Sequence, residues 1–203
     1  MNTRQKLSAG LLSVGLMMAI LSFNGNKSLI VRPSKVISAI TSEERYFTVD
    51  QVARFIASGD STIRLIDLRS PAEYKAFTLP GAINLPYTDL LSKDPSVYFG
   101  KDDIKNITFS NGDFFSGYAL ALAKGMNFRN VYVMKGGINE WFNTVMNSRF
   151  TGERITPAEN ALFEARTIAK RLFTEMNSMP DSLKAKLLAS KKLEAKKLDG
   201  GCE

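Results

Sequence analysis

The chain has 203 residues, with 27 lysines and arginines, 20 aspartates and glutamates, no histidine, and one cysteine, Cys202. Without histidine, it can form neither a Ser-His-Asp triad nor a Cys-His dyad, and the usual zinc sites lack their ligands. A single cysteine also excludes an intrachain disulfide. We therefore expect no metal centre, and we expect no cofactor.

The net charge of +7 is concentrated at the amino terminus. Residues 1–40 contain five basic side chains and no acidic one, which leaves 22 bases and 20 acids for residues 41–203. Nucleic-acid binding would require a basic surface on the folded body. The nearly balanced charge of residues 41–203 does not indicate one, so we expect no nucleic-acid partner.

Residues 7–23 form an uncharged apolar run that follows Arg4 and Lys6. A basic flank before an apolar run is typical of a signal anchor or a secretory signal peptide. We assign residues 1–25 to such a segment and residues 26–45 to a linker. We expect the chain to be held by a membrane helix in the inner (plasma) membrane, with its domain on the periplasmic, extracytoplasmic side. Signal cleavage, which would release the chain into the periplasm, is the alternative.

Short apolar runs then alternate with helical patterns. A helix is expected from Thr48 to Gly59, because Thr48 and Gln51 have the spacing of a capping box. Further helical segments are expected at 71–76, 114–124 and 138–146, and strands at 63–68, 82–85, 104–109 and 131–134. This alternation predicts an α/β fold, in which helices cover both faces of a mostly parallel sheet.

The loop after the strand at 104–109 is the candidate ligand site, because ligands of such folds bind where the strands end. A tight loop that opens a helix can also hold an anion through its backbone amides. The candidate ligand-binding residues are Ser110, Asn111, Gly112, Asp113, Phe114, Phe115 and Ser116. A small anion and a protein partner both remain open as ligands of this loop, since the charge of Asp113 opposes an anion.

Two motifs within residues 46–148 resemble the rhodanese-like (sulfurtransferase) domain. The first runs from Leu65 to Pro86 (LIDLRSPAEY, then LPGAINLP), and the second from Asn130 to Trp141 (NVYVMKGGINEW). The resemblance implies a three-layer α/β/α fold around a mostly parallel sheet. It also implies structural roles for Asp67, Arg69, Glu73, Pro80, Gly81, Gly136, Gly137 and Trp141.

The chain departs from this family at the residues that carry its chemistry. Ser110 lies where the resemblance places the catalytic cysteine, and Phe115 where it places the loop arginine. Phe77 and Thr78 take the place of the family's Gly-His pair. A serine hydroxyl cannot form a persulfide. We therefore assign no catalytic residue, and Ser110 and Cys202 are the two candidates.

Residues 149–203 form a predicted helical tail that ends in Gly-Gly-Cys-Glu. One helix is expected at 157–176, with a single apolar stripe, and a second at 181–198, rich in lysine. We interpret the lysine-rich helix as solvated and partly frayed; contact with anionic lipid or with a partner is the alternative.

Cys202, the only thiol, follows a flexible Gly-Gly pair. It could carry sulfur while the domain serves as a docking surface, or link two chains into a disulfide dimer. The main hypothesis is a pseudoenzyme, which acts as a binding or regulatory module at the cell envelope, in sulfur-compound or redox handling. The alternative is an enzyme, either a sulfurtransferase or sulfur carrier that uses Cys202, or a catalyst of another reaction at Ser110.

Overall fold

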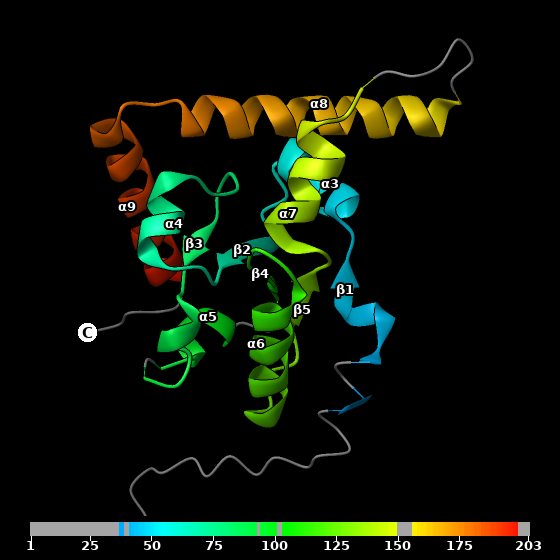
Figure 1. Cartoon of the computed structure of the whole chain (residues 1–203). Helices are drawn as coiled ribbons and strands as arrows, with labels where there is room; N and C mark the ends of the chain where they lie inside the picture. The colour runs from blue at the N-terminus through cyan, green and yellow to red at the C-terminus, as the bar shows by residue number, and fades with distance from the viewer. Residues whose placement is uncertain (1–36, 39–40, 93, 101–102, 150–155, 199–203) are drawn as a thin grey trace, which may run out of the picture. The chain divides into compact units, whose positions relative to one another are not determined.

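The computed structural model of the chain describes residues 37–38, 41–92, 94–100, 103–149 and 156–198 (Figure 1). Among these residues, no helix is long and apolar enough to cross a membrane. The predicted membrane segment at 7–23 and most of the predicted linker lie outside the described residues, as does Cys202.

A five-stranded sheet forms the centre of the fold. Its strands are β1 (Tyr46–Phe47), β2 (Ile63–Asp67), β3 (Ile83–Asn84), β4 (Lys105–Phe109) and β5 (Val131–Met134). Their order in the sheet is β1-β5-β4-β2-β3, and every neighbouring pair is parallel. All strands therefore begin at one edge, the amino edge, and end at the opposite, carboxyl edge. The predicted α/β fold with a parallel sheet is confirmed.

The helices follow the strands closely in the sequence. They are α3 (Val49–Ser58), α4 (Pro71–Ala76), α5 (Ser96–Phe99), α6 (Asp113–Gly125), α7 (Gly137–Trp141), α8 (Pro157–Asn177) and α9 (Asp181–Leu198). Two short 3-10 turns, η1 (Glu43–Arg45) and η2 (Tyr87–Asp89), and a π-helical turn, η3 (Phe142–Met146), complete the described elements. The expected capping box of α3 is present, since Gln51 N donates to Thr48 Oγ1 and Thr48 N to Gln51 Oε1.

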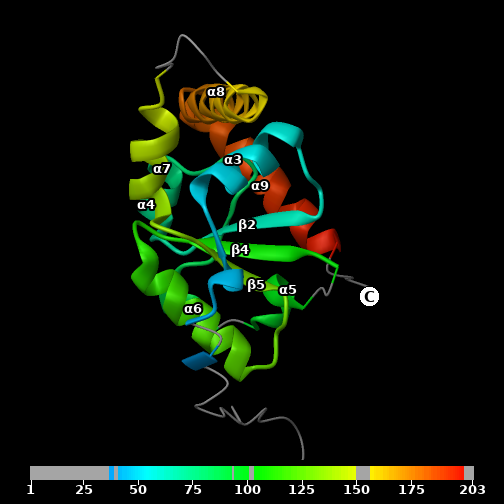
Figure 2. The same ribbon diagram turned by 90° about the vertical axis from the view of Figure 1, so that its right-hand side faces the viewer.

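The sheet separates two apolar cores. Leu65, Ile107 and Met134 pack on the face that carries α3, α7 and α8, whereas Ile66 and Val133 pack on the face that carries α5 and α6. Figure 2 shows α3 and α8 on one side of the strands and α5 and α6 on the other. Successive strand residues point to opposite faces, so the buried apolar runs of the sequence supply both cores.

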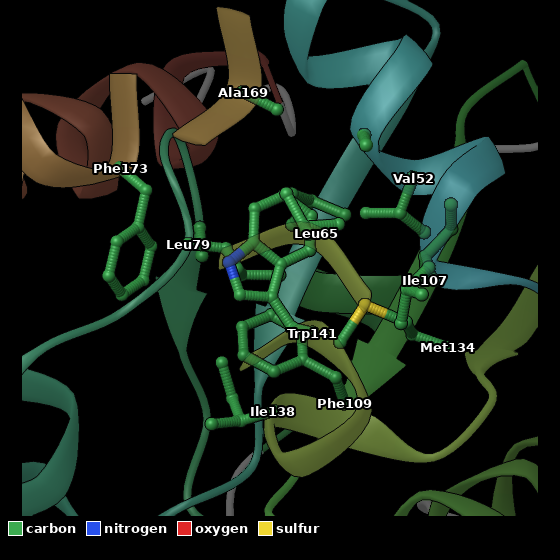
Figure 3. Close-up of a cluster of buried hydrophobic side chains, with 14 residues drawn as sticks. Val52, Leu65, Leu79, Ile107, Phe109, Met134, Ile138, Trp141, Ala169 and Phe173 are labelled. Atoms are coloured by element: carbon green, nitrogen blue, oxygen red, sulfur yellow. The ribbon is translucent and has the colours of Figure 1, made fainter. Parts of the chain in front are cut away.

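Helix α8 belongs to the first of these cores. Its buried residues, Ala165, Ala169, Phe173 and Met176, follow the predicted apolar stripe. Ala169 and Phe173 are in the same cluster as Trp141, whose ring lies among Leu79, Phe109 and Ile138 (Figure 3). The tail beyond residue 149 therefore completes the core of the α/β domain.

The junction of α8 and α9 is tied to the chain after α4. Asn177 Nδ2 donates to Thr78 O at 3.0 Å, and Thr78 N donates to Asn177 Oδ1 at 3.1 Å. Lys184, on α9, is only 3% exposed and donates from Nζ to Ala76 O at 2.7 Å. Burial lowers the pKa of this lysine. The interpretation of this helix as solvated and partly frayed is therefore wrong at Lys184, because a tertiary contact buries its amine.

Candidate functional site

A buried ion pair stands where β2 ends. Arg69 donates to Asp67 from Nη2 (2.6 Å to Oδ2) and from Nε (3.0 Å to Oδ1), and both side chains are almost fully buried. Thr78 Oγ1 donates to the same carboxylate at 2.8 Å. Such a bidentate pair has fixed geometry, so it holds Thr78 against the end of β2.

The guanidinium of Arg69 also contacts Phe77. Its Nη2 donates to Phe77 O at 2.7 Å, and its Cζ lies 4.7 Å from the centre of the Phe77 ring. Nη1 is buried and has no hydrogen-bond partner among the described residues. The Arg69 side chain thus makes only internal contacts. It joins the end of β2 to the segment after α4, whose backbone is also hydrogen-bonded by Asn177 of α8.

The turn after α4 is held by two further polar side chains. Tyr74 OH donates to Ala82 O at 2.8 Å, and burial together with the Asp67 charge strongly raises the tyrosine's pKa. Asn84 Nδ2 donates to Asp67 O and to Arg69 O. Gly81, in the turn of the Leu-Pro-Gly-Ala motif, has a positive φ of 76°. These contacts give the motif a role in fixing the end of β2.

The loop that follows β4 lies at the carboxyl edge beside the start of α7. Ser110 is 3% exposed, and its carbonyl accepts a hydrogen bond from Ile138 N at 2.8 Å. The carbonyl of Asn111 accepts one from Asn139 N at 3.1 Å. The backbone of the loop is therefore fixed by α7, and the Ser110 side chain is largely withdrawn from solvent.

Gly137 permits this close approach. Its φ is 59°, and a Cβ at this position would lie 2.3 Å from Ser110 O. Gly81 offers a comparison, because its φ is also positive but a Cβ there would meet no atom within 4 Å. Gly137 thus combines the backbone requirement with a steric one, whereas Gly81 has the backbone requirement alone.

We expect Gly137→Ala to lower the free energy of unfolding by about 3 kcal/mol, since left-handed strain and a displaced loop add together. Gly81→Ala should lower it by about 1 kcal/mol, from backbone strain alone. Urea unfolding of the two variants and the parent measures both values. Equal losses would show that the contact with Ser110 does not contribute to stability.

Two carboxylates border the loop. Asn111 Nδ2 donates to Glu73 Oε1 at 2.8 Å, and Gly136 N donates to Asp113 Oδ1 at 2.6 Å. Hydrogen bonds from Ser70 and Asn111 lower the pKa of Glu73, so this carboxylate stays ionised at neutral pH. An anion that entered the loop would therefore meet two negative charges.

Aromatic rings occupy the next positions of the chain. Phe115 stacks on Tyr87, with ring centres 3.9 Å apart, and Phe114 meets Phe115 edge-on while remaining 81% exposed. Ser116 is buried, and its Oγ has no hydrogen-bond partner among the described residues. The position that the family resemblance assigns to an arginine thus contributes packing in place of a positive charge.

A recess of about 240 Å³ adjoins the loop at the carboxyl edge. It is lined by Thr41, Glu43, Tyr46, Thr48, Asp113 and Lys135. Burial and the nearby Asp113 charge raise the pKa of Tyr46. The recess therefore presents hydroxyl groups, carboxylates and one ammonium group to a ligand.

The structure brings most of the predicted site residues together. Asp67, Arg69 and Glu73 lie at the end of β2 and the start of α4, and residues 110–116 contact Glu73 and the Gly136-Gly137 turn. Pro80 and Gly81 line a different recess, beside α3, and Trp141 is buried in the core. Asn177 was not predicted, because nothing in a helical stripe marks one polar residue as a partner of a distant backbone.

These features define a parallel α/β domain with a braced loop at its carboxyl edge, and comparisons with known proteins give its family. Residues 48–144 match the model of the rhodanese-like domain. The chain is also 27% identical over 131 residues to the thiosulfate:glutathione sulfurtransferase of Saccharomyces cerevisiae, an alignment that covers 59% of this chain and 88% of that protein. Residues 48–144 therefore form a rhodanese-like domain.

Two solved structures are similar as well. The human single-domain sulfurtransferase has 24% sequence identity and a TM-score of 0.41, over 49% of this chain and 96% of that chain. A single-domain sulfurtransferase from Saccharomyces cerevisiae has 23% identity and a TM-score of 0.43, over 51% and 92%.

Proposed function

We propose that this chain is a membrane-anchored, rhodanese-like binding module that lacks the sulfurtransferase nucleophile. The observation that carries the proposal is Ser110, a hydroxyl residue at the end of β4, 3% exposed and fixed by Ile138 N. Sulfur transfer needs a thiolate, which forms a persulfide. A serine has no such chemistry, and no histidine is present to activate its hydroxyl.

The charges around the loop also favour binding of a protein over capture of a small oxyanion. Glu73 and Asp113 border the loop, and Phe115 supplies no bidentate donor for a sulfur oxyanion or a phosphate. In contrast, Phe114 is 81% exposed, and its sequence neighbour Asp113 lines a polar recess. An exposed aromatic side chain with polar surroundings is typical of protein-binding surfaces.

A second function is supported by the similarity to a thiosulfate:glutathione sulfurtransferase. Cys202 is the only thiol that could act as a carrier. Its thiolate would attack the sulfane sulfur of thiosulfate and release sulfite, which leaves a persulfide on the cysteine. The thiolate of glutathione would then take the sulfane sulfur, which gives glutathione persulfide and restores the Cys202 thiolate.

We expect the parent chain to show no more thiosulfate:glutathione sulfurtransferase turnover than Cys202→Ser. Ser110→Cys in the Cys202→Ser background should gain little, because Glu73 and Asp113 repel the thiosulfate dianion and disfavour a thiolate. The rate of sulfite release in the presence of thiosulfate and glutathione measures the turnover of each of these proteins.

Two outcomes would change the proposed function. Turnover by the parent that disappears in Cys202→Ser would establish the sulfur carrier and contradict the binding module. Strong turnover by Ser110→Cys would mean that the pocket is suited to sulfur transfer and lacks only the thiol. Circular dichroism of each variant confirms that loss of turnover does not reflect unfolding.

A further inference from the structure

Three basic side chains meet at the amino edge of the sheet. Arg45 Nη1 donates to Arg129 O at 2.8 Å, and Lys124 Nζ donates to the same oxygen at 2.7 Å. Arg129 adds its own exposed guanidinium to this group. We name Arg45, Lys124 and Arg129 the amino-edge cluster.

The topology explains why the cluster forms. Arg45 immediately precedes β1, Lys124 is in the last turn of α6, and Arg129 lies two residues before β5. Tyr46, the first residue of β1, pairs with Val133 in β5, so the long Arg45 side chain reaches back along β5 to the Arg129 carbonyl at the amino edge. Helix α6 starts beside the end of β4 and leads back to the start of β5, so its last turn reaches that edge as well (Figure 1).

The described residues supply no acidic partner to the cluster. Ion pairs among these residues join Arg69 to Asp67, Arg166 to Asp50, and Arg171 to Glu175, and none includes a cluster residue. Glu43 and Glu44 share the η1 turn with Arg45, are exposed, and form no ion pair with it among the described contacts.

The two arginines also act on the ammonium group of Lys124. Burial of the amine, together with the charges of Arg45 and Arg129, lowers this pKa to about 8. Like charges in close proximity disfavour one another's ionised forms. An anion placed among the three side chains would relieve this repulsion and would accept hydrogen bonds from two guanidinium groups and one ammonium group.

We propose that the amino-edge cluster binds the phosphate groups of anionic phospholipids at the membrane surface. The inference rests on the proposed membrane anchoring, because only residues 24–44 separate the apolar run from Arg45 in the sequence. A short tether keeps the cluster at a high effective concentration near the headgroups. Basic residues next to a membrane segment are attracted to the negative potential of anionic lipids.

Binding in this way gives the domain an orientation. The strands run from the amino edge to the carboxyl edge, so the loop at 110–112 lies at the end of the strands away from the cluster. The cluster would face the lipid, and the loop and its neighbouring recess would face the aqueous phase. A partner in solution could then reach Phe114 while the domain rests on the membrane.

The test uses the full chain in nanodiscs of phosphatidylcholine, with or without phosphatidylglycerol. An amine-acylating reagent and mass spectrometry measure the modification rate of Lys124 relative to Lys135, which lies at the carboxyl edge. We expect Lys124 to react about fivefold more slowly in the anionic nanodiscs, the change that corresponds to about 1 kcal/mol per basic residue near such a surface. Equal rates in the two lipids would overturn the proposal.

Variants and a free anion identify what protects Lys124. Arg45→Gln with Arg129→Gln should abolish the difference between the two lipids, whereas Arg54→Gln, on α3, should preserve it. Protection that survives the double variant would contradict the cluster. Inorganic phosphate that protects Lys124 fully in neutral nanodiscs, while phosphatidylglycerol does not, would make free phosphate the ligand and overturn the lipid proposal.

Carbonate extraction of the membranes tests separately whether the chain is anchored by its apolar run. A chain that is extracted but shows lipid-dependent protection with added vesicles would retain the cluster proposal and lose the anchor. A chain that resists extraction but shows no lipid dependence would retain the anchor and lose the cluster proposal.

Discussion

Replacement of Arg69 by methionine is expected to lower the free energy of unfolding by about 3–5 kcal/mol, because it leaves the Asp67 carboxylate buried without its cation. Asp67 and Arg69 have side chains that are 0% and 1% exposed. Methionine is apolar and of comparable length, so the change removes mainly charge and hydrogen bonds. Equilibrium unfolding in urea, followed by circular dichroism, measures the loss.

A second arginine–aspartate pair provides the matched control. Arg166 binds Asp50 through two hydrogen bonds of 2.7 and 2.8 Å, but both side chains are about a quarter exposed. Water can solvate the Asp50 carboxylate when the arginine is removed. Arg166→Met should therefore lower the free energy of unfolding by about 1 kcal/mol or less. Similar losses in the two variants would contradict the argument from burial. Asp67→Leu combined with Arg69→Met should recover part of the loss, since no buried charge then remains uncompensated.

Phe173→Ala should lower the free energy of unfolding by about 3–5 kcal/mol, the range for removing a buried phenyl group. The Phe173 ring is 6.3 Å from Trp141, 6.5 Å from Phe77 and 5.7 Å from Phe142, measured between ring centres. Figure 3 shows it beside Leu79 at the border between α8 and the sheet core. Its removal would leave a cavity that the surrounding helices and turns cannot fill.

Phe114→Ala is the control for this phenyl deletion. Phe114 is 81% exposed, so its replacement should change stability by no more than about 0.5 kcal/mol. Urea unfolding under the same conditions compares the two. If Phe173→Ala were as mild as Phe114→Ala, α8 would be an appendage to the domain, and the extended core described above would be wrong.

The sequence predicted the parts of the fold that have a local signal. The runs at 63–68, 104–109 and 131–134 are apolar and β-branched, and the structure has strands within each of them. Strand β1 gave no such signal, because Tyr46–Phe47 has two residues and periodicity needs a longer window. It exists through pairing with Val133 and Met134, far away in the chain.

The candidate site shows the same division. The family resemblance implied structural roles for Asp67 and Arg69, and the structure has Asp67 in register with Phe109, immediately before the loop after β4. The resemblance could not supply the capping of Gly136 N by Asp113 or the bond from Asn111 to Glu73, because each joins residues distant in sequence. The prediction fails most clearly at Lys184. A lysine-rich helix indicates a solvated surface, but the Lys184 amine is buried by its hydrogen bond to the carbonyl of Ala76.

The shared core of α3, the sheet and α8 has a consequence for the order of events during synthesis. Val52 and Phe173 belong to one apolar cluster, so the chain cannot close this core until the ribosome has made most of its length. Pairings so distant in sequence are slow to form, because loop-closure entropy is lost before the contacts are gained. Residues 7–23 thus emerge from the ribosome well before the domain can fold. Under the membrane anchoring proposed above, they would reach the targeting machinery while the rest of the chain is still unfolded.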